Sequence, residues 1–309
     1  MDYETGISTG PADLISKLAT FATSNGWTVT GLGAGNGTLF NKGGIYVGLN
    51  STGTGPNEIS LRGGTGSGGA WNTLANNPGY SVVVNCGAGP FVAYHLFAGE
   101  ENGSEYLNAV IEFASGRFRH LCFGSLIKHG SYTGGTYVDG VNWNASSNWI
   151  NQPEVQFHNV ICDANAQLGS AGGGNAHVYA NFDSKTNNWV RSYEVSNLAT
   201  TTAGCGSVRS AGINSLFPLQ GYARFNLRNL TAPLTYFANR ASSLRSPLGR
   251  IPNMRQVGTV NLEPGAILSI GGDEWKCFPI SQRTDTWGSG SSSIESSGPY
   301  GYAYKMPPP

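Results

Sequence analysis

The alternation of apolar and polar positions in residues 91–127 predicts three consecutive strands. In the middle segment, 105–113, every second residue is apolar, which is the period of a strand that buries one face. The two alternating sets are Leu107, Ala109, Ile111 and Phe113 against Tyr106, Asn108, Val110 and Glu112. In 118–127 both sets contain apolar residues, as in strands covered on both faces. Short Gly-containing turns separate the three segments, so the pattern predicts an antiparallel meander.

A helical period precedes this meander in residues 11–25. One face of the predicted helix carries Leu14, Ile15, Leu18, Phe21 and Ala22,. Pro11 suits the first turn, and Gly26 suits the left-handed conformation that ends many helices. Strands are expected to follow at 27–30, 37–40, 44–49 and 58–61. We therefore expect residues 1–128 to form an α+β domain in which this helix covers one face of a mostly antiparallel sheet.

The remainder of the chain shows short strand patterns between Gly-rich segments. These patterns occur at 155–160, 177–182 and 189–194, and a hairpin is predicted from 268–270 and 274–278,. We expect residues 129–280 to form a loop-rich β region that ends in this hairpin. The predicted fold class is thus α+β and mostly antiparallel β, with an N-terminal helix packed on a sheet, followed by β-rich, loop-rich regions.

Residues 281–309 have the low complexity of an arm that buries no core of its own,. An arm of this kind can lock a symmetric assembly, because its ordering cost is met when it binds a neighbour. We therefore expect adjacent subunits to order the tail from Ser281 onward, or one of the long Gly-rich loops.

Composition narrows the range of partners. Only 12% of the 309 residues are charged, and the formal net charge is zero. Because nucleic-acid binding requires a basic surface, this balance argues against a nucleic-acid partner. No apolar run reaches the length of a membrane span, and the polar first residues do not predict a secretion signal. We expect neither a nucleic acid nor a membrane among the partners.

The residue types that commonly carry chemistry are dispersed along the chain. The five cysteines form no CxxC pair, which favours free thiols in a reducing compartment,. His95 and His120 lie on neighbouring predicted strands, but a metal site would require a third ligand. The segment 63–69, GGTGSGG, lacks the Lys-Ser/Thr of a phosphate loop and favours a flexible loop,. Since no catalytic motif occurs, we predict a protein that is not an enzyme, without catalytic residues, cofactor or metal.

Residues 129–153 are rich in Tyr, Trp, Asn and Gly, a combination that suits two kinds of contact. Aromatic rings flanked by amides stack on sugars and hydrogen-bond to their hydroxyls. The same residue types are enriched in subunit interfaces. The candidate glycan or interface residues are Tyr132, Tyr137, Trp143 and Trp149.

Three blocks of the sequence resemble a family of tailed-bacteriophage virion structural proteins. They are NGWTV after the first helix, RFRHLCFGSLIKHGSYTGGTY at 117–137, and LGRIPNMRQVGTVNLEPGAILSIGGDEWKCFP at 248–279. The resemblance implies a structural role in the neck or collar, the tail or the baseplate of a virion that is assembled in the host cytoplasm. It implies copies of the chain and other virion proteins as partners, and it brings no catalytic residue. The alternative is a carbohydrate-binding module of a tail fibre or baseplate that recognises host-surface glycans.

Overall fold

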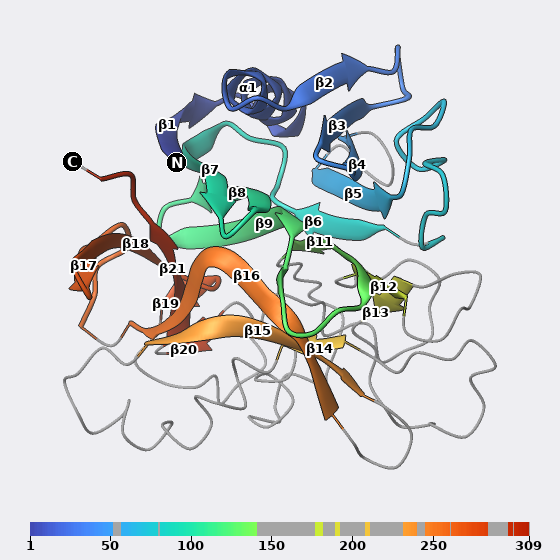
Figure 1. Cartoon of the computed structure of the whole chain (residues 1–309). Helices are drawn as coiled ribbons and strands as arrows, with labels where there is room; N and C mark the ends of the chain where they lie inside the picture. The colour runs from blue at the N-terminus through green and yellow to red at the C-terminus, as the bar shows by residue number, and fades with distance from the viewer. Residues whose placement is uncertain are drawn as a thin grey trace.

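The computed structural model describes residues 1–51, 57–79, 81–140, 177–181, 189–191, 208–210, 231–239, 245–259, 261–283, 296–298 and 300–308. These residues form three mostly antiparallel sheets and one helix. Figure 1 shows the sheets as layers, with the central sheet between the other two. The predicted strand at 155–160 lies outside the described residues. The β-rich, mostly antiparallel character expected from the sequence is confirmed.

The central sheet contains the predicted meander. Its strand order is β1 (Asp2–Ser8), β7 (Phe91–Glu101), β8 (Ser104–Ala114), β9 (Arg117–Ser125), β11 (Thr133–Gly140), β12 (His177–Asn181) and β13 (Trp189–Arg191). The short strands β19 (Gln282–Arg283) and β20 (Ser296–Gly298) join it beside β9. The three strands of the meander pair antiparallel in the expected order, with Leu96 opposite Ala109 and Ala109 opposite Leu121. The prediction of three consecutive strands is therefore confirmed.

The N-terminal sheet and the helix lie on one side of the central sheet (Figure 1). The helix α1 spans Pro11–Ser24, and the strands are β2 (Thr28–Gly31), β3 (Thr38–Lys42), β4 (Ile45–Asn50), β5 (Glu58–Gly64) and β6 (Val82–Asn85). The predicted helix and the strands that follow it are confirmed as elements. The apolar residues of α1 share one cluster with strand residues of this sheet and of one face of the meander. We call this cluster the helix-side core.

The C-terminal sheet lies on the other side (Figure 1). Its strand order is β14 (Val208–Ser210), β15 (Thr231–Asn239), β16 (Arg245–Gly258), β21 (Tyr300–Lys305), β18 (Asp273–Pro279) and β17 (Ile267–Ile270), with β10 (Ile127–Lys128) beside β16. The β17–β18 pair is the predicted hairpin, which is confirmed. Buried residues of this sheet form a second cluster with the opposite face of the meander, which we call the tyrosine-side core.

The prediction that 105–113 is a half-buried strand is wrong. In β8 three of the four residues of the more polar alternating set, Tyr106, Asn108 and Val110, are each 0% exposed, and the fourth, Glu112, is half-buried. Tyr106 and Val110 belong to the tyrosine-side core, because the C-terminal sheet covers this face. The strands that provide this cover lie more than a hundred residues further along the chain, so the local alternation does not reveal them.

Part of the C-terminal tail, the strand β21, belongs to the C-terminal sheet and is not a separate arm. β21 lies between β16 and β18 and pairs antiparallel with both. Tyr302 and Tyr304 are fully buried in the tyrosine-side core. Gly301 permits the close approach, because a Cβ atom there would lie 2.1 Å from the carbonyl oxygen of Phe278. The expectation that neighbouring subunits order the tail is therefore wrong for Tyr300–Lys305, which pairs within its own chain.

The central sheet contains strands from both sides of residue 128, so the domain boundary predicted there does not divide the described fold.

The Gly-rich segment 63–69 is not simply a flexible loop, since Gly63 and Gly64 end β5. A Cβ atom on Gly63 would lie 2.4 Å from the ring of Trp189, so this glycine provides space for packing.

Candidate functional site

The four aromatic residues predicted as glycan or interface contacts do not gather on one described surface. Tyr137 lies on β11 and is fully buried in the tyrosine-side core. Tyr132 is half-buried, and its hydroxyl donates a hydrogen bond of 2.9 Å to the carbonyl oxygen of Leu248. Burial raises the pKa of both phenols. Trp143 and Trp149 lie outside the described residues. The Tyr137 ring is therefore packed against this chain's own core and is not presented to a ligand.

The two histidines of the meander lie on one face but do not meet. Val110 of β8 is opposite His95 on one side and opposite His120 on the other, so a strand separates them. His95 Nδ1 lies 2.8 Å from the Tyr3 hydroxyl. Desolvation by burial lowers the pKa of His95 to about 4, so the ring is neutral near pH 7,.

His120 connects the meander to the C-terminal sheet. Its Nε2 lies 2.8 Å from the Pro279 carbonyl oxygen, and its Nδ1 lies 2.7 Å from the Tyr304 hydroxyl. A carbonyl only accepts, so Nε2 carries the proton and Nδ1 accepts from Tyr304. Burial lowers the pKa of His120 to about 3, which keeps the ring neutral. Both ring nitrogens are used in hydrogen bonds that hold sheets together, which leaves neither free to bind a metal.

Metal and thiol chemistry find no support among the described residues. No group of three or more His, Cys, Asp or Glu side chains there is arranged to hold a metal ion. Cys86, Cys122 and Cys277 are buried cysteines. Burial raises the pKa of Cys86 and of Cys277 to about 12, so these thiols stay protonated and poorly nucleophilic at neutral pH,.

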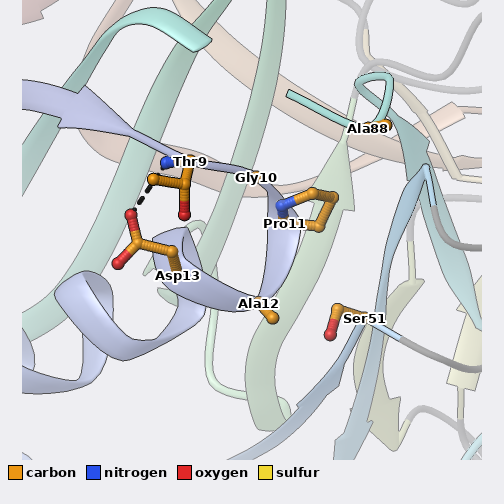
Figure 2. Close-up of a pocket in the computed structure, with 7 residues that line it drawn as sticks. All are labelled: Thr9, Gly10, Pro11, Ala12, Asp13, Ser51 and Ala88. Atoms are coloured by element: carbon orange, nitrogen blue, oxygen red, sulfur yellow. Dashed lines mark hydrogen bonds between the residues drawn. The ribbon is translucent and has the colours of Figure 1, made fainter. Parts of the chain in front are cut away.

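An open pocket of about 340 Å³ lies at the N-terminus of α1 (Figure 2). It is lined by Thr9, Gly10, Pro11, Ala12, Asp13, Ser51 and Ala88. A helix N-terminus attracts anions, but here the Asp13 carboxylate accepts a 2.9 Å hydrogen bond from the Thr9 backbone N–H,. This bond lowers the pKa of Asp13, so the carboxylate is ionised at neutral pH. The pocket thus carries its own negative charge and disfavours an anionic ligand.

The outer edge of the central sheet carries the most exposed large apolar side chain of the described residues. Ile7 of β1 is 74% exposed, and Val92 of β7 is 49% exposed. Gly6 pairs with Tyr94 and Ser8 pairs with Phe91, so the register shift leaves Val92 and Ala93 on the stretch of β7 that faces Ile7. Within the described residues β1 pairs only with β7, so no described strand pairs with its other side. We call the outer side of β1, together with Ile7 and Val92, the β1 edge.

An unpaired strand edge presents a row of backbone N–H and C=O groups that can bind another strand. Exposed apolar side chains beside such a row favour association, because contact removes them from water. The sequence does not predict this site, since the first residues, MDYETGISTG, are polar and carry no strong strand pattern. The alternation of Tyr3, Thr5 and Ile7 is a weak strand signal that would have indicated it,.

Comparisons with known proteins assign no family to the chain: no family model matches it, and no curated protein matches its sequence. In the described part of the chain, no helix combines the length and the apolar character that crossing a membrane requires.

Proposed function

We propose that this chain is a structural component of a tailed-bacteriophage virion that acts through subunit–subunit contacts in the neck or collar, or in the tail or baseplate. Its localisation is then the virion, and its partners are copies of itself and other virion proteins. The three sequence blocks that resemble virion structural proteins support the assignment to a tailed-phage virion. In this proposal the helix α1 packs on a sheet, as the sequence predicts, and stabilises the layer that supports the contact edge.

The observation that carries the proposal is the β1 edge. His95 and His120 make hydrogen bonds inside the fold, and Cys86, Cys122 and Cys277 are buried. Ile7 and Val92, in contrast, are exposed beside the side of β1 that pairs with no described strand. This arrangement provides a surface to which another protein can bind. The described residues form no catalytic centre. The arrangement therefore suits a subunit that associates with other chains.

Immunogold electron microscopy tests the proposal. An antibody raised against the purified chain is applied to virions of the phage that encodes it. We expect labelling at a fixed position, at the head–tail junction or at the tail end. Virions without label, with the chain found only in the unassembled fraction of the lysate, would contradict a structural role.

Glycan recognition, the alternative function, receives no support from the described residues, because Tyr137 is buried and Tyr132 is bonded to Leu248. A glycan array separates the two functions. Binding that is lost in Trp143→Ala or Trp149→Ala, together with unlabelled virions, would replace the structural proposal with the glycan one.

A further inference from the structure

We propose that two copies of this chain pair antiparallel through β1, so that the central sheet continues from one copy into the other across a two-fold axis. The inference rests on the proposed function for the role of this pairing, and it names the partner of the β1 edge as a second copy.

The β1 edge lacks most of the features that protect a sheet edge from another strand. Natural edges are blocked by Lys, by Pro or by charged side chains that point inward. β1 contains no Lys, Arg or Pro in its sequence DYETGIS. Of its two acidic residues, Asp2 is exposed at the end of the strand. Glu4 accepts a 2.8 Å hydrogen bond from the Tyr94 hydroxyl of its own chain. An approaching strand therefore meets an edge that is open rather than blocked.

The register follows from the alternation of backbone groups. Along an edge strand, every second residue directs its N–H and C=O outward. Two identical edges related by a two-fold axis must match these outward residues with each other, so the axis passes through a residue and not between two. Centring the axis on Thr5 pairs all seven residues of β1. Tyr3 of one copy then lies opposite Ile7 of the other, and the exposed apolar side chain gains an aromatic neighbour.

The neighbouring registers are less favourable. With the axis on Glu4, the two Glu4 carboxylates lie directly opposite each other, and like charges in that position destabilise the pair. With the axis on Gly6, Asp2 and Tyr3 extend past the end of the other strand, so the ladder is shorter. The register centred on Thr5 places Glu4 opposite Gly6, so no two like charges lie directly opposite each other. One register therefore stands out, as specific pairing requires.

A second copy suits this edge because the chain carries a formal net charge of zero. Two copies therefore do not repel each other through their overall charge, which would oppose association of a strongly charged chain. A two-fold pair also uses the same patch on both copies, which is the commonest form of closed symmetry in soluble oligomers.

Analytical ultracentrifugation of the full chain gives the first test. We expect a monomer–dimer equilibrium for the wild type, and about tenfold weaker dimerisation for Ile7→Lys, because the two Tyr3–Ile7 contacts are both lost. Ile267→Lys is the matched control, since Ile267 is an exposed isoleucine on β17, at the edge of the C-terminal sheet. It should dimerise as the wild type does. A monomeric wild type, or equal weakening by both variants, would overturn the proposal.

A charge exchange at residue 5 tests the register. Thr5 is exposed and donates a hydrogen bond to the Tyr94 carbonyl oxygen, which Thr5→Lys and Thr5→Glu both lose. Each variant alone should dimerise about fivefold more weakly than the wild type, because like charges meet on the axis. An equimolar mixture should recover dimers that contain one copy of each, as native mass spectrometry can count. A mixture that associates no better than either variant alone would contradict the pairing of Thr5 with Thr5.

The two proposals fail separately. Labelled virions together with a chain that stays monomeric would remove the β1 pairing and leave the structural role. Dimers that follow the predicted charge exchange together with unlabelled virions would retain the pairing and remove the virion role.

Discussion

β8 and β1 belong to the same central sheet, but their surroundings differ. β8 is paired on both sides and covered on both faces, by the helix-side core and by the tyrosine-side core. β1 is paired on one side and carries an isoleucine that is 74% exposed. An interior strand of this kind contributes mainly to the stability of the fold. The edge strand contributes less to stability, which leaves it available for contact with another chain.

The largest expected effect comes from removing the cover of the tyrosine-side core. Deletion of residues 300–309 removes β21 from between β16 and β18, together with two fully buried tyrosines. We expect the chain to lose cooperative folding, which thermal unfolding followed by circular dichroism checks. Deletion of residues 307–309 is the control, because it leaves β21 in place. A deletion variant that melts as the wild type does would show that β21 is dispensable.

Phe123→Ala tests the opposite, helix-side core. The Phe123 ring is fully buried between Trp27 and Phe40, with both ring centroids 5.6 Å away. We expect a loss of about 3–5 kcal/mol in the free energy of unfolding, since truncation leaves a cavity. Ile7→Ala on the β1 edge should change it by less than about 0.5 kcal/mol, as exposed positions usually do. Urea denaturation measures both, and equal losses would remove the contrast between interior and edge.

The interior strands should also make the fold sensitive to mild acid. His95 and His120 have pKa values lowered to about 4 and about 3, below the usual value of about 6.5,. Below pH 6.5 the unfolded chain binds protons that the folded chain does not, so stability falls as the pH falls toward these values. The slope approaches about 1.4 kcal/mol per pH unit for each histidine.

Urea denaturation at pH 7 and at pH 5 measures this effect before most carboxylates titrate. We expect lower stability at pH 5, and a smaller difference in His95→Gln, which lacks the contribution of His95 but retains that of His120. A His95→Gln variant with the same pH dependence as the wild type would show that His95 is not held neutral by burial.

The smallest effect is expected at Asn108 in the middle of β8. Its side chain is fully buried, and neither its amide oxygen nor its amide nitrogen bonds to a protein group. Because an unbonded buried amide is costly, Asn108→Leu should raise the stability by about 1 kcal/mol. Thr28→Leu is the control, because Thr28 is exposed on β2, and it should leave the free energy of unfolding nearly unchanged. A marked loss in Asn108→Leu would show that the amide is needed.

The sequence predicts those parts of the fold whose signals are local. The helical period of 11–25 and the alternation in 91–127 depend on neighbouring residues, so α1 and the meander could be recognised. The second cover of β8 could not, because it comes from strands at the far end of the chain. β21 was missed because the short run YGYAYK follows a segment rich in Gly and Ser. Its burial depends on pairing with β16 and β18.

The candidate site was predictable only in part. Aromatic residues suit glycan and interface contacts by their chemistry, but the buried Tyr137 shows that composition does not distinguish a surface ring from a core ring. The β1 edge depends on exposure and on the absence of a second described neighbour, and neither property can be read from the residues 1–10. Its weak alternation becomes informative only when the pairing with β7 is known.

Hydrogen exchange of the full chain, measured at low and high protein concentration, tests the central claim most directly. We predict that the amides of β8 exchange slowly at both concentrations, because this strand is paired and covered on all sides. The outward-facing amides of β1 should exchange quickly in the dilute sample and slowly in the concentrated one, as a second copy pairs with them. Exchange in β1 that does not depend on concentration would contradict the account of this edge as the site of subunit contact.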